Sequence, residues 1–172
     1  MTRSFIPVSI SILTISDSRN LSNDKSGNLL EDKVLKSVHI LFDRKIVKDD
    51  IFEIQKISKN WIKKHEVEII ISTGGTGLTG RDVSPEAFRQ IFDKEIEGFG
   101  ELFRYLSFKK IGTSTIQSRA IAGVSNGTYI FVLPGSPSAC RDAWDDILLH
   151  QLDYRHKPCN FVEIMPRLLN KN

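Results

Sequence analysis

The amino-acid sequence predicts an α/β fold built on a mostly parallel β-sheet with helices on both faces. Strand patterns alternate with helical patterns along most of the chain, which favours parallel strands joined by crossover helices. The segment Val67–Ser72 is β-branched and nearly all apolar, as in a strand covered on both faces. Ala120–Ser125 and Thr128–Leu133, joined by Asn126 and Gly127, predict one antiparallel hairpin. Ligands of such sheets bind beyond the carboxyl ends of the strands.

The first part of the chain predicts a strand, a helix and a second strand. An alternating pattern predicts a strand at Val8–Ile15, followed by a polar loop at Ser16–Ser26. Apolar residues then recur at intervals of three and four, at Leu30, Val34, Val38 and Leu41. This spacing predicts a helix over about Gly27–Leu41. A short strand is expected at Arg44–Lys48.

Two further helices are expected to begin at polar residues that favour helix starts. Asp50 and Glu53 form a capping-box pattern, and an apolar helical face continues from there to Trp61. Ser84 and Pro85 predict another start, with Ser84 as the N-cap and Pro85 in the first helical position. Each of these helices follows a predicted strand, which places its N-terminus at the ligand-binding edge of the sheet.

The second half of the chain predicts two more helices. An amphipathic helix is expected around Phe99–Leu106, and its bulky face indicates core packing, with a subunit interface as the alternative. Ser136 and Pro137 open a long helix that continues to about Gln151. The tail from Asp153 carries two further prolines and is expected to be irregular.

The overall composition predicts one globular domain over residues 1–172 and argues against several partners. The net charge is +3 and no five like charges are consecutive, which argues against nucleic acid. No apolar stretch reaches the length of a membrane span, so we expect no membrane partner. Cys140 and Cys159 lack metal-ligand spacing, and we expect both to be reduced thiols of a cytoplasmic protein.

A glycine-rich turn, Ser72–Gly77, ends the buried strand at residues 67–72. Glycines allow backbone amides to point at an anion, and two threonine hydroxyls add further donors. A tight turn without a ligand is the alternative. Polar and glycine residues in a row at the end of a buried strand favour function over that alternative. The residues predicted to face an anion are Thr73, Gly74, Gly75, Thr76 and Gly77.

Two nucleotide-binding motifs resemble this turn, and we reject both. Gly75, Gly77 and Gly80 fit G-x-G-x-x-G, but the turn follows the third predicted strand and no helix begins directly after it. A P-loop would need a lysine and a hydroxyl residue where Arg81 and Asp82 stand. The sequence therefore predicts an anion site of another kind.

Two carboxylates are expected beside the glycine turn. Asp82 follows the turn and is a candidate ligand for Mg²⁺, or a group that orients a bound hydroxyl or water. Asp50 is assigned to the helix cap, which leaves Asp49 free to face the same edge of the sheet. The two carboxylates could share a metal ion. Stabilisation of helix N-termini is the alternative role for both.

A second strand-to-helix loop, Leu133–Pro137, repeats the logic of the glycine turn. A buried strand ends, Gly135 permits close approach, and a helix begins at Ser136. A plain connection is the alternative, but two such units at one edge of a sheet favour a ligand site.

The loop after the first strand adds polar candidates. Ser16, Asp17 and Ser18 are placed to contact a ligand, and Arg19 or Arg81 is a candidate phosphate ligand. A solvated loop is the favoured interpretation for Arg19.

These motifs resemble the molybdenum-cofactor biosynthesis family that includes MoaB, MogA and the G domains of gephyrin-type proteins. The segments that carry the resemblance are Ser72–Gly77, Arg81–Ala87, Glu97–Glu101 and Leu133–Pro137. The chain is most similar to the MoaB branch, through Phe103–Leu106, Ile111–Thr115, Gln117–Ala120 and Lys157–Phe161. The resemblance covers nearly the whole chain.

The resemblance implies a three-layer α/β/α fold that assembles as homotrimers or hexamers and acts with other enzymes of the pathway. It implies transfer of AMP from Mg²⁺-bound ATP to the terminal phosphate of molybdopterin, with release of pyrophosphate. Asp49 and Asp82 would be the catalytic, metal-linked carboxylates. The residues that would bind substrate are Ser16, Asp17, Thr73, Gly74, Gly75, Thr76, Gly77, Arg81, Ser84, Pro134, Gly135 and Ser136.

Two functional hypotheses are open on these residues. One is a molybdopterin adenylyltransferase that uses Asp49 and Asp82. The other is a non-catalytic, oligomeric molybdopterin carrier or scaffold in the same pathway, motivated by the MoaB-like tail and the Phe99–Leu106 face. Turnover of ATP in the presence of molybdopterin separates them.

Overall fold

The computed structural model describes residues 3–169, which form a six-stranded sheet in the order β2-β1-β3-β6-β5-β4. β1, β2, β3 and β6 are mutually parallel, and β5 pairs antiparallel with both β6 and β4. The strands span Ser9–Ile15 (β1), Ile40–Val47 (β2), Ile69–Thr73 (β3), Lys94–Glu95 (β4), Ile121–Ser125 (β5) and Thr128–Leu133 (β6). The predicted mostly parallel sheet and its hairpin are confirmed.

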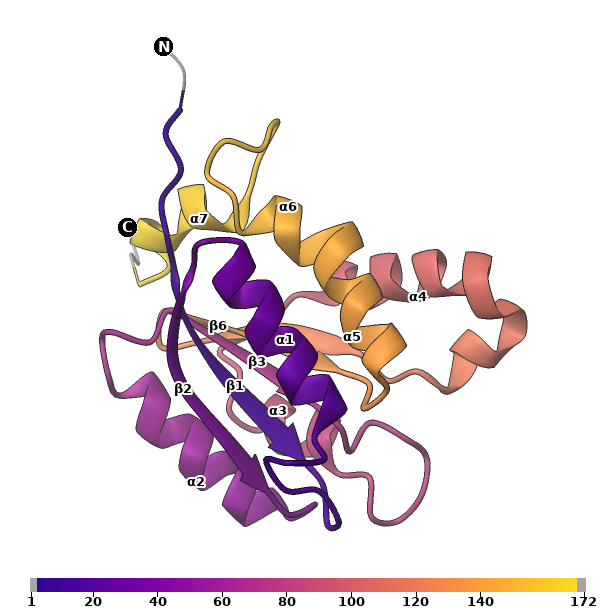
Figure 1. Ribbon diagram of the computed structural model, residues 1–172. Helices are drawn as coiled ribbons and strands as arrows, with labels where there is room; N and C mark the ends of the chain where they lie inside the picture. Colours follow the sequence, from indigo (N-terminus) through magenta and orange to yellow (C-terminus); the bar gives the residue numbers. More distant parts are fainter. Residues whose placement is uncertain (1–2, 170–172) are drawn as a thin grey trace.

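Helices cover both faces of the sheet, which confirms the three-layer α/β/α arrangement (Figure 1). The helices are α1 (Lys25–Lys36), α2 (Ile51–Ile62), α3 (Ser84–Arg89), α4 (Glu97–Ile111), α5 (Pro137–Ala143), α6 (Leu149–Gln151) and α7 (Phe161–Ile164). A π-helical turn, Trp144–Leu148, joins α5 to α6. α1, α4 and α5 pack on one face, with Phe99, Phe131 and Trp144 in that core. α2 and α3 pack on the other, around Trp61 and Phe88.

The register of the sheet brings four loops to one edge. Ile15 pairs with Val47, Thr14 with Thr73, and Thr73 with Leu133, so β1, β2, β3 and β6 end nearly abreast. The loops that follow β1, β2 and β3 lie together beyond the strand ends (Figure 1). The candidate residues of all four loops are therefore neighbours.

The predicted helix over Gly27–Leu41 is wrong at its C-terminal end. α1 ends at Lys36. Val38 has a positive φ of 62°, a conformation that a right-handed α-helix cannot include. Ile40 then donates its amide to Val8 and begins β2, so this strand is longer than the expected Arg44–Lys48. The helical spacing of Val38 and Leu41 is a coincidence, because sheet pairing decides the structure of this segment.

Other departures are smaller and lie at element boundaries. The amphipathic pattern at Phe99–Leu106 marks only the middle of α4, and the two-residue strand β4 was not expected. The tail is not wholly irregular, because Asn160 caps α7 and a 3₁₀ turn follows at Met165–Arg167. Within residues 3–169, no helix is both long and apolar enough to cross a membrane. Cys140 is buried, Cys159 is exposed, and both thiols are free.

Candidate active site

The loop from Gly74 to Val83, here called the first loop, joins β3 to α3 and depends on glycine at its start. Gly74 and Gly75 have φ values of 102° and 64°, a region that favours glycine. A Cβ built on Gly75 would lie 2.7 Å from Asp49 Oδ1, and one built on Gly74 would overlap the Ile15 carbonyl oxygen. The turn therefore packs directly against the ends of β1 and β2, and no larger residue fits there.

Asp49 and Asp82 both border this turn, Asp49 at Gly75 and Asp82 at Gly77, and Asp17 lies beside Asp49. The Asp49 amide lies 3.3 Å from Asp17 Oδ1. Partial burial raises the pKa of Asp49, and the negative charges of Asp17 and Asp82 raise it further. Like charges shift a pKa in this way only when they are close. The predicted meeting of Asp49 and Asp82 is therefore consistent with the electrostatics, and Asp17 joins them.

Asp82 is held by its own loop. Its Oδ2 atom accepts hydrogen bonds from Thr79 Oγ1 (2.6 Å) and from the Thr79 amide (2.9 Å). These bonds and the amide of Gly77 lower the pKa of Asp82. Asp82 is therefore ionised at neutral pH, and the loop fixes the direction of its carboxylate.

Ser84 does not play the role of helix cap that its position predicts. It is the first residue of α3, and its hydroxyl makes no capping bond. Instead, Ser84 Oγ donates to the Gly74 carbonyl at 2.7 Å, and its amide donates to Gly75 at 2.9 Å. Because Ser84 is fully buried, its side chain holds the glycine turn in shape and is not exposed to a substrate. The Ser84 hydroxyl therefore donates to the nearby Gly74 carbonyl and does not form the predicted capping bond.

The two threonines of the turn differ in what they offer to a ligand. Thr73 is buried, and its hydroxyl lies 2.9 Å from the Pro134 carbonyl and 3.1 Å from Cys140 Sγ. Thr73 therefore ties β3 to the loop after β6.

The backbone amides of Gly75 and Thr76 have no acceptor among the described residues. These two amides are the candidate donors of the turn for an anion.

Arg81 is paired in this structure. Its guanidinium binds the Asp17 carboxylate through Nε and one terminal nitrogen, at 2.7 to 3.0 Å. Both side chains are exposed, so the pair contributes little stability and can open toward a ligand. The pairing bridges the loop after β1 to the first loop, which the sequence did not indicate.

The second loop, Pro134–Ser136, lies against the first. A Cβ on Gly135 would stand 3.3 Å from the Gly74 Cα atom. Ser136 caps α5, as predicted, by accepting from the Ala139 amide at 3.2 Å. The Gly135 carbonyl accepts from Arg19 (3.2 Å) and from Ser26 Oγ (2.7 Å).

Sequence reasoning missed the roles of Arg19 and Ser26. The favoured interpretation of Arg19 was a solvated loop residue, but its side chain is about one-third exposed and holds the second loop. Its partner carbonyl is 116 residues away along the chain, and no local pattern identifies such a contact. A groove of about 630 Å³ runs from Ser16 and Asp17 along β2, with Lys45 and Lys48 on its lining. No pattern in the sequence indicated that these two lysines lie beside the candidate site.

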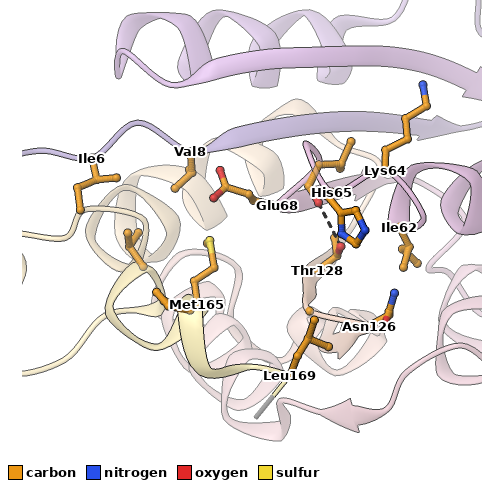
Figure 2. A pocket seen from close by; sticks show the side chains of 14 residues that line it. Ile6, Val8, Ile62, Lys64, His65, Glu68, Asn126, Thr128, Met165 and Leu169 are labelled. Carbon is orange, nitrogen blue, oxygen red and sulfur yellow. Dashed lines mark hydrogen bonds between the residues drawn. The ribbon is translucent and has the colours of Figure 1, made fainter.

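A separate cavity of about 340 Å³ lies at the opposite end of the sheet (Figure 2). It is lined by the starts of the strands, such as Val8 and Thr128, and by Met165 from the C-terminal turn. It contains none of the predicted site residues. Because parallel sheets bind ligands at their carboxyl edge, the two loops are the better candidate.

The acidic cluster fits a divalent cation in its chemistry. Magnesium takes one or two carboxylates and completes its shell with water and substrate phosphates. Asp49 and Asp82 supply two carboxylates. Burial is the main cause of the raised pKa of Asp49, and repulsion from Asp17 and Asp82, which a cation would relieve, adds to it. Within residues 3–169, no group of three or more histidine, cysteine or acidic side chains is arranged to hold a metal ion, so the chain would supply at most two carboxylates to one.

Comparison with known proteins assigns the family. Residues 11–154 match a family described as a probable molybdopterin binding domain. Molybdenum cofactor biosynthesis protein B of Escherichia coli K12 is 51% identical over 157 residues, which cover 91% of this chain and 92% of the relative. The chain belongs to the MoaB family of molybdenum cofactor biosynthesis proteins.

Solved structures of MoaB proteins share the fold. A crystal structure of a molybdenum cofactor biosynthesis protein B is 41% identical, has a TM-score of 0.84, and matches 87% of this chain and 94% of that one. MoaB of Pyrococcus furiosus, described as a tungsten cofactor synthesizing protein, is 33% identical with a TM-score of 0.75 and coverages of 83% and 91%. The predicted family is confirmed, and the MoaB-like chain acts in molybdenum cofactor biosynthesis.

Proposed function

We propose that this MoaB-like protein binds molybdopterin and transfers AMP from ATP to its terminal phosphate. The observation that carries the proposal is that Asp49 and Asp82 flank the glycine turn, where the amides of Gly75 and Thr76 have no acceptor among residues 3–169. Carboxylates that bind a cation and amides that bind an anion, placed side by side, suit phosphoryl chemistry, which depends on positioning and charge neutralisation.

In the proposed reaction, a terminal phosphate oxygen of molybdopterin attacks the α-phosphorus of ATP. The bond from that phosphorus to the bridging oxygen breaks, and pyrophosphate leaves. The amides of Gly75 and Thr76 hold the pterin phosphate, while the second loop and Ser16 line the pterin. The groove along β2, with Lys45 and Lys48, faces the same site and suits the triphosphate.

Asp49 and Asp82 would hold Mg²⁺ in this proposal. The ion would neutralise charge on the phosphates of ATP. Asp82 keeps a fixed direction through Thr79, so it is preorganised for this role. Arg81 and Asp17 would separate when the substrate binds, because their ion pair is exposed and weak.

The test is incubation of the protein with ATP, Mg²⁺ and molybdopterin, followed by detection of adenylylated pterin and pyrophosphate. We expect both products in equal amounts and only when all components are present. No product above a protein-free control, with a substrate that a known adenylyltransferase accepts, would refute the proposal.

A non-catalytic molybdopterin carrier is the second candidate. It is favoured because the charged groups of the site already have partners within the protein. Arg81 is bound to Asp17, and the Asp82 carboxylate accepts two hydrogen bonds from Thr79. The carrier predicts pterin binding without any consumption of ATP. Isothermal titration with molybdopterin, with and without ATP, distinguishes it from the enzyme.

We also propose that the protein self-associates as a homotrimer or hexamer, in the cytoplasm, alongside other enzymes of the pathway. Phe99 and Phe103 are buried in the core, so the predicted packing role is correct for them. The outer side of α4 and the following turn nevertheless expose large apolar residues: Leu102, Tyr105, Phe108, Ile111 and Ile116. Light scattering coupled to size-exclusion chromatography measures the assembly, and a monomer at micromolar concentration would refute it.

A further inference from the structure

Arg119 lies between α4 and β5 and reaches into the first loop. Its Nε atom is 2.9 Å from the Gly77 carbonyl and 3.2 Å from the Thr76 carbonyl. One terminal nitrogen is 2.8 Å from the Asp82 carbonyl, and the other pairs with Glu86 on α3. A single side chain therefore binds three carbonyls of the loop that carries Asp82.

The peptide between Thr76 and Gly77 links Arg119 to the Asp82 carboxylate. A planar trans peptide points its carbonyl and its amide in opposite directions. Arg119 binds the carbonyl side, and the Gly77 amide on the other side faces Asp82, where it helps to lower the pKa of that carboxyl. A Cβ on Gly77 would lie 2.7 Å from the carboxylate, which confirms the close approach.

Arg119 is itself held in place. Arg104 of α4 donates to the Ala120 carbonyl at 3.0 Å and to the Ser118 carbonyl at 3.5 Å, on either side of Arg119. The Arg119 side chain is 26% exposed. The guanidinium group is planar and carries five donors in fixed directions, so it can bind several carbonyls at once in a way that lysine cannot.

We propose that Arg119 is a positioning residue for Asp82: it holds the peptides of the first loop so that the Asp82 carboxylate faces Asp49 and the bound substrate. Arg119 binds the first loop through three backbone carbonyls, and its positive charge also helps to lower the pKa of the Asp82 carboxyl. The catalytic part of this role rests on the proposed adenylyl transfer. The effect of Arg119 on the rigidity of the first loop can be measured without substrate.

The rest of the site has separate supports. Ser84 fixes the carbonyls of Gly74 and Gly75, and Arg19 with Ser26 fixes the second loop. Loss of Arg119 should therefore disturb Asp82 more than the amides or the loop that bind the pterin. Turnover should fall while pterin affinity changes little.

The activity experiment compares Arg119→Lys and Arg119→Ala with two controls. Arg89→Ala removes another arginine–glutamate pair, with Glu95, that makes no bond to the first loop. Glu86→Gln removes only the ion pair of Arg119. We expect kcat to fall about 10-fold in Arg119→Lys and about 100-fold in Arg119→Ala, since displacement of a catalytic group by 1 Å costs on that order. In both Arg119 variants the KM for pterin should stay within about threefold of wild type. In both controls kcat should stay within about twofold of wild type.

A second measurement needs no substrate. Amide hydrogen exchange at Gly77 and Thr79, whose amides face the Asp82 carboxylate, reports on the position of that carboxylate. We expect exchange there to accelerate at least about 10-fold in Arg119→Ala, with β6 unchanged, which also verifies that the variant is folded.

The outcomes separate the two proposals. Unchanged exchange at Gly77 and Thr79, or a kcat within twofold of wild type, would overturn the positioning role. An equal loss in Glu86→Gln would overturn it too, because the ion pair would then be sufficient. If the wild-type protein forms no product, the proposed function fails, and the exchange measurement alone decides whether Arg119 holds the loop.

Discussion

The first and second loops are built alike but carry different chemistry. Each follows a parallel strand, and the first residue of each is hydrogen-bonded to the neighbouring strand. An arginine also donates to backbone carbonyls of each loop: Arg119 to three in the first and Arg19 to one in the second. Only the first loop carries carboxylate and guanidinium groups, Asp82 and Arg81. The second loop, Pro134–Ser136, has no ionisable side chain.

This difference suggests a division of labour. The loop with an ionised carboxylate can bind a cation and take part in phosphoryl transfer, whereas the neutral loop can only contact and orient a ligand. Both loops meet at Gly74 and Gly135, so one molecule can touch both. This assignment would be contradicted by a first-loop variant that weakens pterin binding alone, or by a second-loop variant that lowers turnover alone.

The largest expected effect belongs to Asp82→Asn. This nearly isosteric change removes the charge and leaves an oxygen that can still accept from Thr79. We expect turnover to fall about 10²- to 10³-fold, as when one preorganised charge-stabilising group is lost from an active site. The pterin dissociation constant should stay within threefold, as measured by titration calorimetry. Equal turnover in the variant and the wild type would remove Asp82 from the mechanism.

The next effect separates two glycines of the first loop. Gly75→Ala places a methyl group at a φ of 64°, against Ser84 Oγ and 2.7 Å from Asp49 Oδ1. We expect the free energy of unfolding to fall by about 1–3 kcal/mol and the activity to fall with it. Gly80→Ala meets no atom within 4 Å and should change stability by less than about 0.5 kcal/mol. Urea unfolding of both variants is the measurement, and similar losses would contradict the account.

The second loop should respond in binding. Arg19→Ala removes one of the two donors to the Gly135 carbonyl and leaves Ser26 Oγ at 2.7 Å. We expect the pterin dissociation constant to rise about fivefold to tenfold, roughly the net value of one hydrogen bond, with kcat at saturation within twofold. Ser22→Ala, in the same loop after β1, removes a hydroxyl bonded only to Asn20 and is the control. A fall in kcat without a change in binding would contradict the division of labour.

The smallest effect is on stability and depends on pH. The folded protein raises the pKa of Asp49 above 3.8, first through partial burial and then through the charges of Asp17 and Asp82. The stability from this group is present at low pH and is lost as pH rises through the raised pKa. Asp49→Asn should therefore raise the melting temperature at pH 7 without Mg²⁺, and the gain should vanish near pH 3.8 and below. A variant that melts below wild type at every pH would contradict this electrostatic explanation.

The sequence predicted the parts of the fold that depend on local pattern. Buried strands such as Ile69–Thr73 and the hairpin turn at Asn126-Gly127 have clear signals, and the structure confirms them. The errors are at Val38–Leu41, where pairing of β2 with β1 overrides a helical spacing, and at β4, which is too short to leave a pattern. Local sequence cannot report the partner strand that decides such segments.

The candidate site was predicted in its residue types but not in its supports. Asp49 and Asp82 follow from the rule that parallel strands end at one edge, and in the structure each lies beside the glycine turn, while their catalytic role stays a prediction. Ser84 was assigned to a cap because its position resembles one, although its hydroxyl bonds Gly74. Arg119 lies more than 30 residues from every residue of the first loop that it binds. Such supports become visible only in three dimensions.

The most direct test of the division between the loops is a single-turnover experiment with protein in excess over molybdopterin. Wild type, Asp82→Asn and Arg19→Ala are each mixed with ATP and Mg²⁺, and bound pterin and adenylylated pterin are measured in the same samples. We predict that wild type binds and converts the pterin, Asp82→Asn binds it without conversion, and Arg19→Ala binds it less but converts what it binds. Conversion at the wild-type rate by Asp82→Asn, or loss of pterin binding in that variant, would contradict the account.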